Sequence, residues 1–120
     1  SNLNKTADYI KTEFEKSGAK VSEQNYRIEG RDYRNIIAIF GNESNERIVI
    51  GAHYDSCGET VGADDNASGV AGLIELAHLL SKENLTQTVE LVAYTLEEPP
   101  YFATNAMGSH VHAKSLKDNN

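Results

Sequence analysis

The stretch "RIVIGAHYD", residues 47–55, decides the fold class, because an apolar run leads directly into a histidine and an aspartate. A second stretch of this kind, "TVELVAYTLEE" at residues 88–98, ends in two glutamates. Both runs have few polar interruptions, which predicts strands that are covered on both faces. Between them, "DNASGVAGLIELAHLL" at residues 65–80 carries apolar residues at helical spacing. This strand–helix–strand order predicts an α/β protein.

The segments outside this unit extend the same alternation. Residues 4–21 have the apolar spacing of an amphipathic helix, and residues 21–26 alternate weakly. Residues 34–40, "RNIIAIF", predict a further strand, and residues 107–118 predict a short helix at the end of the chain. We therefore expect an α/β fold with a mixed, mostly parallel sheet flanked by helices.

Composition limits the classes of function. The 120 residues suit one small domain, and a net charge of −7, from 11 Lys and Arg against 18 Asp and Glu, argues against nucleic-acid binding. No apolar run has the length of a membrane span, so no membrane partner is expected. Cys57 is the single cysteine and cannot form an internal disulfide. The compartment stays open between cytoplasmic and exported.

Acidic residues and one histidine gather at one predicted edge of the sheet. They are His53 and Asp55 after the first strand, Asp64 and Asp65 at the helix start, and Glu97 and Glu98 after the second strand. Five carboxylates in one place must take up protons, pair with Lys or Arg, or bind a metal, and no Lys or Arg lies in these motifs. Imidazole and carboxylate ligands suit Zn²⁺, with Mn²⁺ or Co²⁺ as alternatives. At two-residue spacing on a strand, Asp55 could accept the ring N–H of His53 and orient it.

Each motif also has an ordinary explanation. A lone histidine is commonly structural, paired aspartates cap helices, and glutamates after a strand begin solvated loops. Asp64 is expected to be such a capping or supporting acid. We expect Cys57 to be a small, buried or half-buried residue, His78 to lie on the surface, and His110 and His112 to be tail histidines. The three acidic motifs together nevertheless favour a metal site.

Three blocks closely resemble the co-catalytic dizinc exopeptidases of the bacterial leucyl aminopeptidase and glutamate carboxypeptidase type. They are "GAHYDS", "GADDNASGVAGLIELAHLL" and "VAYTLEEPPYFATNAMGS", within a resemblance that runs from about Asn35 to Lys114. It implies the zinc-exopeptidase (phosphorylase/hydrolase-like) fold and two Zn²⁺ ions. By position it implies that His53 binds the first zinc, Asp65 bridges both and Glu98 binds the second. Glu97 would be the general base and Asp55 would orient His53. The resemblance also implies a cis peptide bond between Asp65 and Asn66.

The chain departs from this family in its ligand set. The family supplies a further acidic ligand and a late histidine, whereas the only acidic residue after Glu98 is Asp118, in a polar tail. We therefore expect residues 1–120 to be the N-terminal part of a single zinc-peptidase domain. By itself the chain should bind zinc weakly or not at all and should be inactive. Its open sheet edge should favour self-association.

For the parent protein the resemblance implies a zinc-dependent aminopeptidase that acts on peptide or aminoacyl substrates. One alternative is a single-zinc enzyme resembling glutaminyl-peptide cyclotransferases, and another is a non-catalytic binding module on the same fold. The intact "GADDNASG", residues 62–69, favours the peptidase over the cyclotransferase. The presence of His53, Asp65, Glu97 and Glu98 argues against a binding module for the parent.

Overall fold

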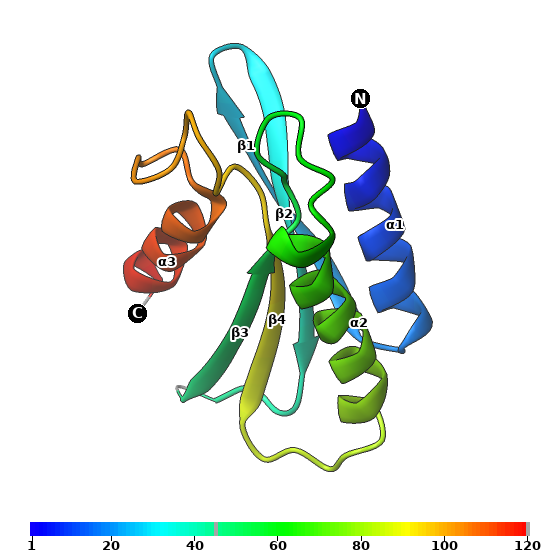
Figure 1. Cartoon of the computed structure of the whole chain (residues 1–120). Helices are drawn as coiled ribbons and strands as arrows, with labels where there is room; N and C mark the ends of the chain where they lie inside the picture. Colours follow the sequence, from blue (N-terminus) through cyan, green and yellow to red (C-terminus); the bar gives the residue numbers. More distant parts are fainter. Residues whose placement is uncertain (45, 120) are drawn as a thin grey trace.

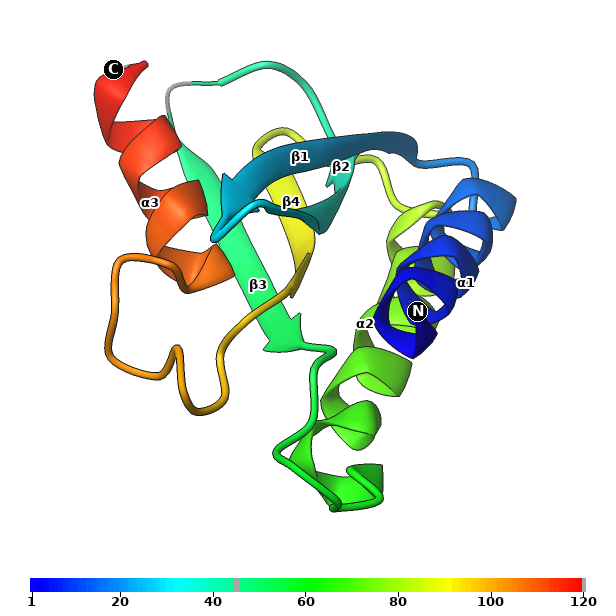
Figure 2. The ribbon, with the colours of Figure 1, turned by 90° about the horizontal axis from the view of Figure 1, so that it is seen from above.

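The computed structural model describes residues 1–44 and 46–119. Its elements form three layers, with α1 (Asn2–Lys16) and α2 (Ser68–Leu80) on one face of a sheet and α3 (Gly108–Asp118) on the other (Figures 1 and 2). The predicted α/β class, a sheet flanked by helices, is confirmed. None of the described helices is both long and apolar enough to cross a membrane.

The sheet contains β1 (Lys20–Ile28), β2 (Arg31–Phe40), β3 (Arg47–His53) and β4 (Thr88–Tyr94) in the order β1-β2-β4-β3. Glu29 and Gly30, both with positive φ, connect β1 to β2, so this pair is antiparallel. β2 also runs antiparallel to β4, and β3 runs parallel to β4. The expected mixed sheet is present, but it is not mostly parallel within the described residues, because two of its three strand pairings are antiparallel. Its parallel part within the described residues is the β3–β4 pair, because α2 provides the crossover between those two strands.

The two apolar strands differ in their surroundings. β4 lies between two neighbours, and six of its seven residues are buried. β3 lies at the edge of the described sheet and exposes Ile48, Val49 and Ile50 at 47%, 37% and 38%. The prediction that both strands are covered on both faces is therefore correct for β4 and wrong for β3. A continuous apolar run predicts a strand that needs cover, but it does not give the position of that strand in the sheet.

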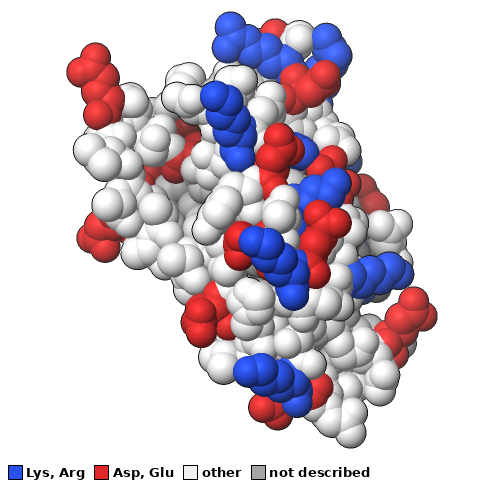
Figure 3. Space-filling view, turned by 90° about the vertical axis from the view of Figure 1, so that its right-hand side faces the viewer, with Lys and Arg blue, Asp and Glu red and all other residues white. Residues whose placement is uncertain are grey.

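The main core lies between the sheet and the first two helices. Ala7, Ile10 and Phe14 are fully buried on one face of α1, as their spacing predicts. Arg34 of β2 also holds α1, through an ion pair with Asp8 at 2.5 Å. Basic and acidic side chains are interspersed on the face where α1 lies (Figure 3). This mixture forms no broad basic surface on that face.

The α3 layer corrects the prediction for His112. That residue is only 2% exposed, and its Nε2 lies 3.1 Å from the Oε1 atom of Glu90 on β4. Arg47 of β3 pairs with the second carboxylate oxygen of Glu90. His112 is therefore a buried contact between α3 and the sheet, because its helical position points it inward. His110 is exposed, as expected for a tail histidine, and His78 is half-buried rather than fully on the surface.

Candidate metal centre

Three predicted ligand residues meet at the carboxyl ends of β3 and β4. The Nε2 atom of His53 lies 3.0 Å from Oδ1 of Asp65 and 3.6 Å from Oε1 of Glu98. One potential ligand atom from each residue lies within 4.8 Å of the others. The three side chains come from the end of β3, the turn before α2 and the loop after β4. The parallel β3–β4 pair thus brings together residues that are far apart in the sequence.

Asp55 lies behind this group and connects two of its segments. Its carboxylate accepts the backbone N–H of Glu97 at 3.2 Å and that of Glu98 at 2.9 Å. The Nδ1 atom of His53 is 3.0 Å from the backbone oxygen of Asp55 and 3.4 Å from its carboxylate. Asp55 therefore lies where orientation of His53 was predicted, with its backbone oxygen closer than its carboxylate. Its contact with both glutamate amides was not predicted, because it depends on the tertiary position of the loop.

The turn that carries Asp65 is η1 (Ala63–Ala67), a short helical segment that leads into α2. Asp65 and Asn66 have non-helical backbone angles, and the bond between them is cis, as the resemblance implies. Gly62 precedes the turn with a φ of 71°, a left-handed conformation that suits glycine. The Asn66 side chain accepts the N–H of Gly69 at 3.2 Å. Asp64 makes no side-chain capping bond within the described residues, so the capping role expected of it falls to Asn66.

The electrostatics of the group are unfavourable without a cation. The pKa of Glu98 is raised above its ordinary value. Partial burial is the largest cause and the negative charge of Asp65 is the second, although His53 opposes the shift. Within residues 1–44 and 46–119, the ion contacts of Asp65 and Glu98 are with His53 and not with Lys or Arg. A divalent cation between these side chains would relieve the repulsion of the two carboxylates.

The donor set fits zinc in chemistry and in spacing. Zn²⁺ holds N and O ligands at about 2.0–2.2 Å in a tetrahedral arrangement, so neighbouring ligand atoms lie about 3.3–3.6 Å apart. The separations of 3.0 and 3.6 Å from His53 Nε2 are close to that range. Metal binding by His53, Asp65 and Glu98 remains a prediction that these distances support.

Glu97 occupies a different position from its neighbour Glu98. Its Oε2 atom accepts the backbone N–H of Ser109, in the first turn of α3, at 3.4 Å. The pKa of the Tyr94 phenol is raised to about 12. Burial of Tyr94 is the largest cause, and the negative charge of Glu97 is the second. Glu97 is therefore held from the α3 side of the sheet and not within the group of three ligand atoms. The role of Glu97 as general base stays a prediction.

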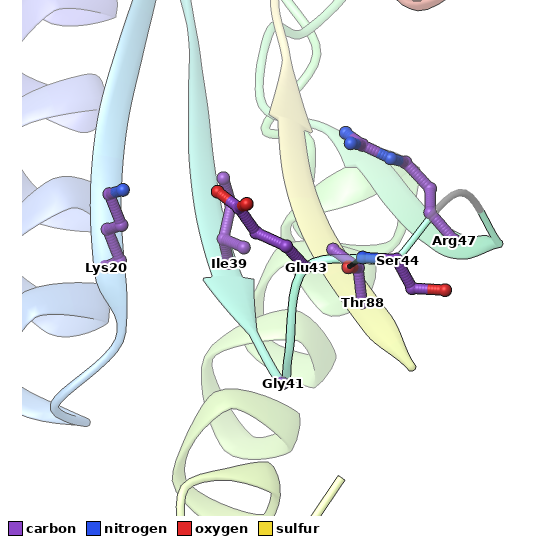
Figure 4. A pocket seen from close by; sticks show the side chains of 7 residues that line it. All are labelled: Lys20, Ile39, Gly41, Glu43, Ser44, Arg47 and Thr88. Carbon is purple, nitrogen blue, oxygen red and sulfur yellow. Dashed lines mark hydrogen bonds between the residues drawn. The ribbon is translucent and has the colours of Figure 1, made fainter. Parts of the chain in front are cut away.

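Two hollows show where the surface is open. One of about 370 Å³ adjoins the candidate centre and is lined by Asp55 and Glu98 together with Tyr33, Tyr54 and Tyr101. Another of about 660 Å³ lies at the opposite end of the sheet, near Lys20, Arg47 and Thr88 at the starts of their strands (Figure 4). None of the predicted site residues lines the larger hollow. Its size therefore carries no functional assignment.

Comparison with known proteins identifies the family of the chain. Residues 35–120 match the sequence model of Peptidase family M28. The chain belongs to peptidase family M28. The resemblance to zinc exopeptidases is therefore confirmed, and the chain is part of a peptidase-type enzyme family.

Two curated relatives align with most of this chain. The chain is 52% identical over 124 residues to the "Uncharacterized protein YfbL" of Escherichia coli (strain K12), covering 97% of this chain and 38% of that protein. It is 34% identical over 92 residues to "Leucine aminopeptidase 2" of Trichophyton rubrum, covering 76% of this chain and 18% of that protein. The chain thus spans well under half the length of these relatives.

Solved structures confirm the fold. A putative Zn-dependent exopeptidase from Bacteroides vulgatus superposes with a TM-score of 0.71 and 32% identity, over 92% of this chain and 43% of that one. The glutaminyl cyclase of Porphyromonas gingivalis superposes with a TM-score of 0.69 and 32% identity, over 75% of this chain and 35% of that one. The fold of the chain is therefore that of zinc exopeptidases, a fold that a glutaminyl cyclase shares.

Proposed function

We propose that this chain is the metal-binding N-terminal part of an aminopeptidase-type zinc exopeptidase, which hydrolyses peptide bonds at the N-terminus of peptides. The observation that supports the proposal best is the meeting of one imidazole nitrogen and two carboxylate oxygens, from His53, Asp65 and Glu98, without Lys or Arg as ion partners in the described chain. The likeness to a leucine aminopeptidase and to a Zn-dependent exopeptidase favours the same function.

Five residues of the chain would have separate roles in this reaction. His53, Asp65 and Glu98 would hold zinc, with Asp65 as the bridging ligand of a two-ion site. Bound zinc would polarise the scissile carbonyl and acidify a water molecule. Glu97 would accept a proton at its carboxylate and return it to the leaving amine. Asp55 would hold His53 and the amides of both glutamates in place.

The ligand count predicts the behaviour of the chain alone. The three candidate ligand residues found among residues 1–44 and 46–119 cannot complete two zinc sites, since tight zinc sites normally use three or four ligands each. We therefore propose that the chain binds zinc weakly and does not hydrolyse peptides by itself. Calorimetric titration with Zn²⁺ and an assay with a leucine anilide test this directly. Tight binding of two ions with turnover would contradict the incomplete-site proposal, whereas weak binding or none, without turnover, would support it.

A glutaminyl-peptide cyclotransferase is the second candidate, because a glutaminyl cyclase shares the fold at 32% identity. The polypeptide at the full length of its relatives, loaded with zinc, should be given a peptide with N-terminal glutamine and a leucine anilide in parallel. Release of leucine supports the aminopeptidase, and cyclisation of the glutamine supports the alternative. A Glu97→Gln variant of the same polypeptide should lose activity if Glu97 is the base. Zinc without either activity would leave the binding-module alternative.

We also propose that β3 allows self-association of this chain. Ile48, Val49 and Ile50 are exposed on a strand that pairs on one side within the described sheet. Sedimentation at increasing concentration should show dimers or larger species, and Val49→Lys should reduce them. Leu79→Lys is the matched control, because Leu79 is 55% exposed and lies on α2, not on β3. A wild-type chain that stays monomeric at high concentration would contradict the proposal.

A further inference from the structure

The side chain of Asn35 joins three parts of the molecule. It is fully buried on β2. Its Oδ1 atom accepts the backbone N–H of Thr95 at 3.1 Å, and its Nδ2 donates to the backbone oxygen of Gly108 at 2.8 Å. The same Nδ2 also donates to the Gln24 side chain at 2.9 Å. The amide thus uses both of its donors and its acceptor oxygen within the protein.

Thr95 and Gly108 are the two ends of the loop that carries Glu97 and Glu98. Thr95 follows the last residue of β4, and Gly108 is the first residue of α3. The N–H of Gly108 also donates directly to the oxygen of Thr95 at 2.8 Å. The ends of the loop are therefore closed by one backbone bond and by the two bonds to Asn35. We call this group, Asn35, Thr95 and Gly108, the loop clamp.

The loop clamp requires a glycine at residue 108. A Cβ atom on Gly108 would lie 2.1 Å from Oδ1 of Asn35 and 2.7 Å from the backbone oxygen of Thr95. Both distances are shorter than any ordinary carbon–oxygen contact, and one partner is backbone that cannot move aside cheaply. The close approach of α3 to the end of β4 therefore depends on Gly108 and Asn35 together.

This closure determines where the amide of Ser109 lies. Ser109 follows Gly108 directly, and its N–H donates to Oε2 of Glu97 at 3.4 Å. On the other side of the loop, the Asp55 carboxylate accepts the N–H groups of Glu97 and Glu98. Asp55 therefore fixes the backbone of the glutamates, and the loop clamp fixes the donor that faces the Glu97 carboxylate.

We propose that Asn35 is a positioning residue for Glu97, acting through Gly108 and the N–H of Ser109. The role of Glu97 as general base rests on the proposed function, but the positioning of its carboxylate does not. Asn35 lies on a strand 62 residues before Glu97 and has no hydrogen bond to it. Its effect on Glu97 passes through the start of α3.

The test measures the Ser109 amide by ¹H–¹⁵N NMR on the 120-residue chain with a chelator present. In the wild-type background, Glu97→Gln should shift the Ser109 amide, because a charged acceptor becomes neutral. In Asn35→Asp, the shape and the Thr95 contact remain, but a carboxylate faces the oxygen of Gly108 and cannot donate to it. The response of Ser109 to Glu97→Gln should then be lost. Gly108→Ala should cause the same loss from the opposite side of the loop clamp.

Two controls separate positioning from general stability. Gln24→Ala removes the third partner of Asn35 and leaves Thr95 and Gly108 in contact with it. Ile10→Val destabilises the core on α1, on the other face of the sheet. Both controls should keep the Ser109 response. If the response also persists in Asn35→Asp and in Gly108→Ala, the positioning role is wrong.

The outcome is independent of zinc. A polypeptide at the full length of its relatives that fails to bind Zn²⁺ would overturn the proposed function, but loss of the Ser109 response in Asn35→Asp would still support the positioning role. Conversely, zinc binding by the wild type together with an unchanged Ser109 response in the variants would overturn the positioning role alone. Should Asn35→Asp not fold, Gly108→Ala decides the question by the same measurement.

Discussion

Two groups of histidine and carboxylate side chains lie on the same sheet. One group is partly exposed to solvent and the other is buried. The edge cluster, His53, Asp65 and Glu98, has side-chain exposures of 18%, 73% and 17%. In the buried cluster, His112 and Glu90 are each only 3% exposed at the side chain, and Arg47 pairs with Glu90 from the edge strand. A basic side chain balances Glu90, whereas the two carboxylates of the edge cluster face one histidine. The presence of a balancing cation therefore separates a structural cluster from a candidate metal site.

The buried cluster should have the largest effect on stability. His112→Ala removes the contact of α3 with Glu90 and leaves a cavity beside Tyr94, whose hydroxyl is 3.4 Å from His112 Nδ1. We expect the free energy of unfolding in urea to fall by about 3 kcal/mol. His110→Ala is the matched control, since His110 is exposed on the same helix, and it should cost less than about 0.5 kcal/mol. Equal losses in the two variants would mean that the buried cluster does not hold α3.

The edge cluster should show the opposite behaviour. His53→Ala should cost less free energy of unfolding in the metal-free chain than His112→Ala, because the His53 side chain is 18% exposed and that of His112 is 3% exposed. Its effect should appear in the affinity for Zn²⁺, which should fall by more than about 100-fold because a ligand is lost, a larger loss than outer partners cause. His78→Ala, on α2, is the control and should keep the affinity. An unchanged affinity in His53→Ala would remove His53 from the proposed ligands.

The sequence predicted the edge cluster better than the buried cluster. His53, Asp65 and Glu98 follow or precede regular elements, and the strand–helix–strand order places such positions at one edge of the sheet. His112 follows a loop whose path the sequence does not determine, so its burial depends on the docking of α3. One available signal was Glu90, a carboxylate inside a strand that is otherwise apolar. Such a residue needs a buried partner, but the sequence does not identify which one.

The same limit applies to Asn35 and to β3. Asn35 is an amide within "RNIIAIF", and a buried amide implies hydrogen-bond partners, yet two of its three partners lie 60 and 73 residues away. β3 and β4 have similar apolar patterns, and only the pairing order shows that β3 is at the edge. Local patterns thus predict the type of element. They also predict that a buried amide requires hydrogen-bond partners and that an apolar strand requires covering residues. The tertiary pairing of the elements decides which residues become those partners and that cover.

The smallest expected effect concerns Glu98 in the metal-free chain. Its pKa is raised in the folded state, so between the ordinary value of 4.5 and the raised value the folded chain binds more protons than the unfolded chain. The free energy of unfolding then falls as pH rises through that range and stays lower at neutral pH. Glu98→Gln removes this loss and should slightly raise the melting temperature at pH 7 with a chelator present. The two proteins should converge in acid, where Glu98 is protonated in both states.

The same substitution should act in the reverse direction on metal binding. With Zn²⁺ present, Glu98→Gln should weaken the affinity, because a neutral amide replaces a charged ligand. Glu83→Gln, at an exposed position after α2, should change neither quantity. A variant that gains stability without zinc and loses affinity with it would show that the repulsion in the edge cluster serves cation binding. A variant that is less stable at pH 7 without zinc would show that attractive contacts hold Glu98, which would make the edge cluster resemble the buried one.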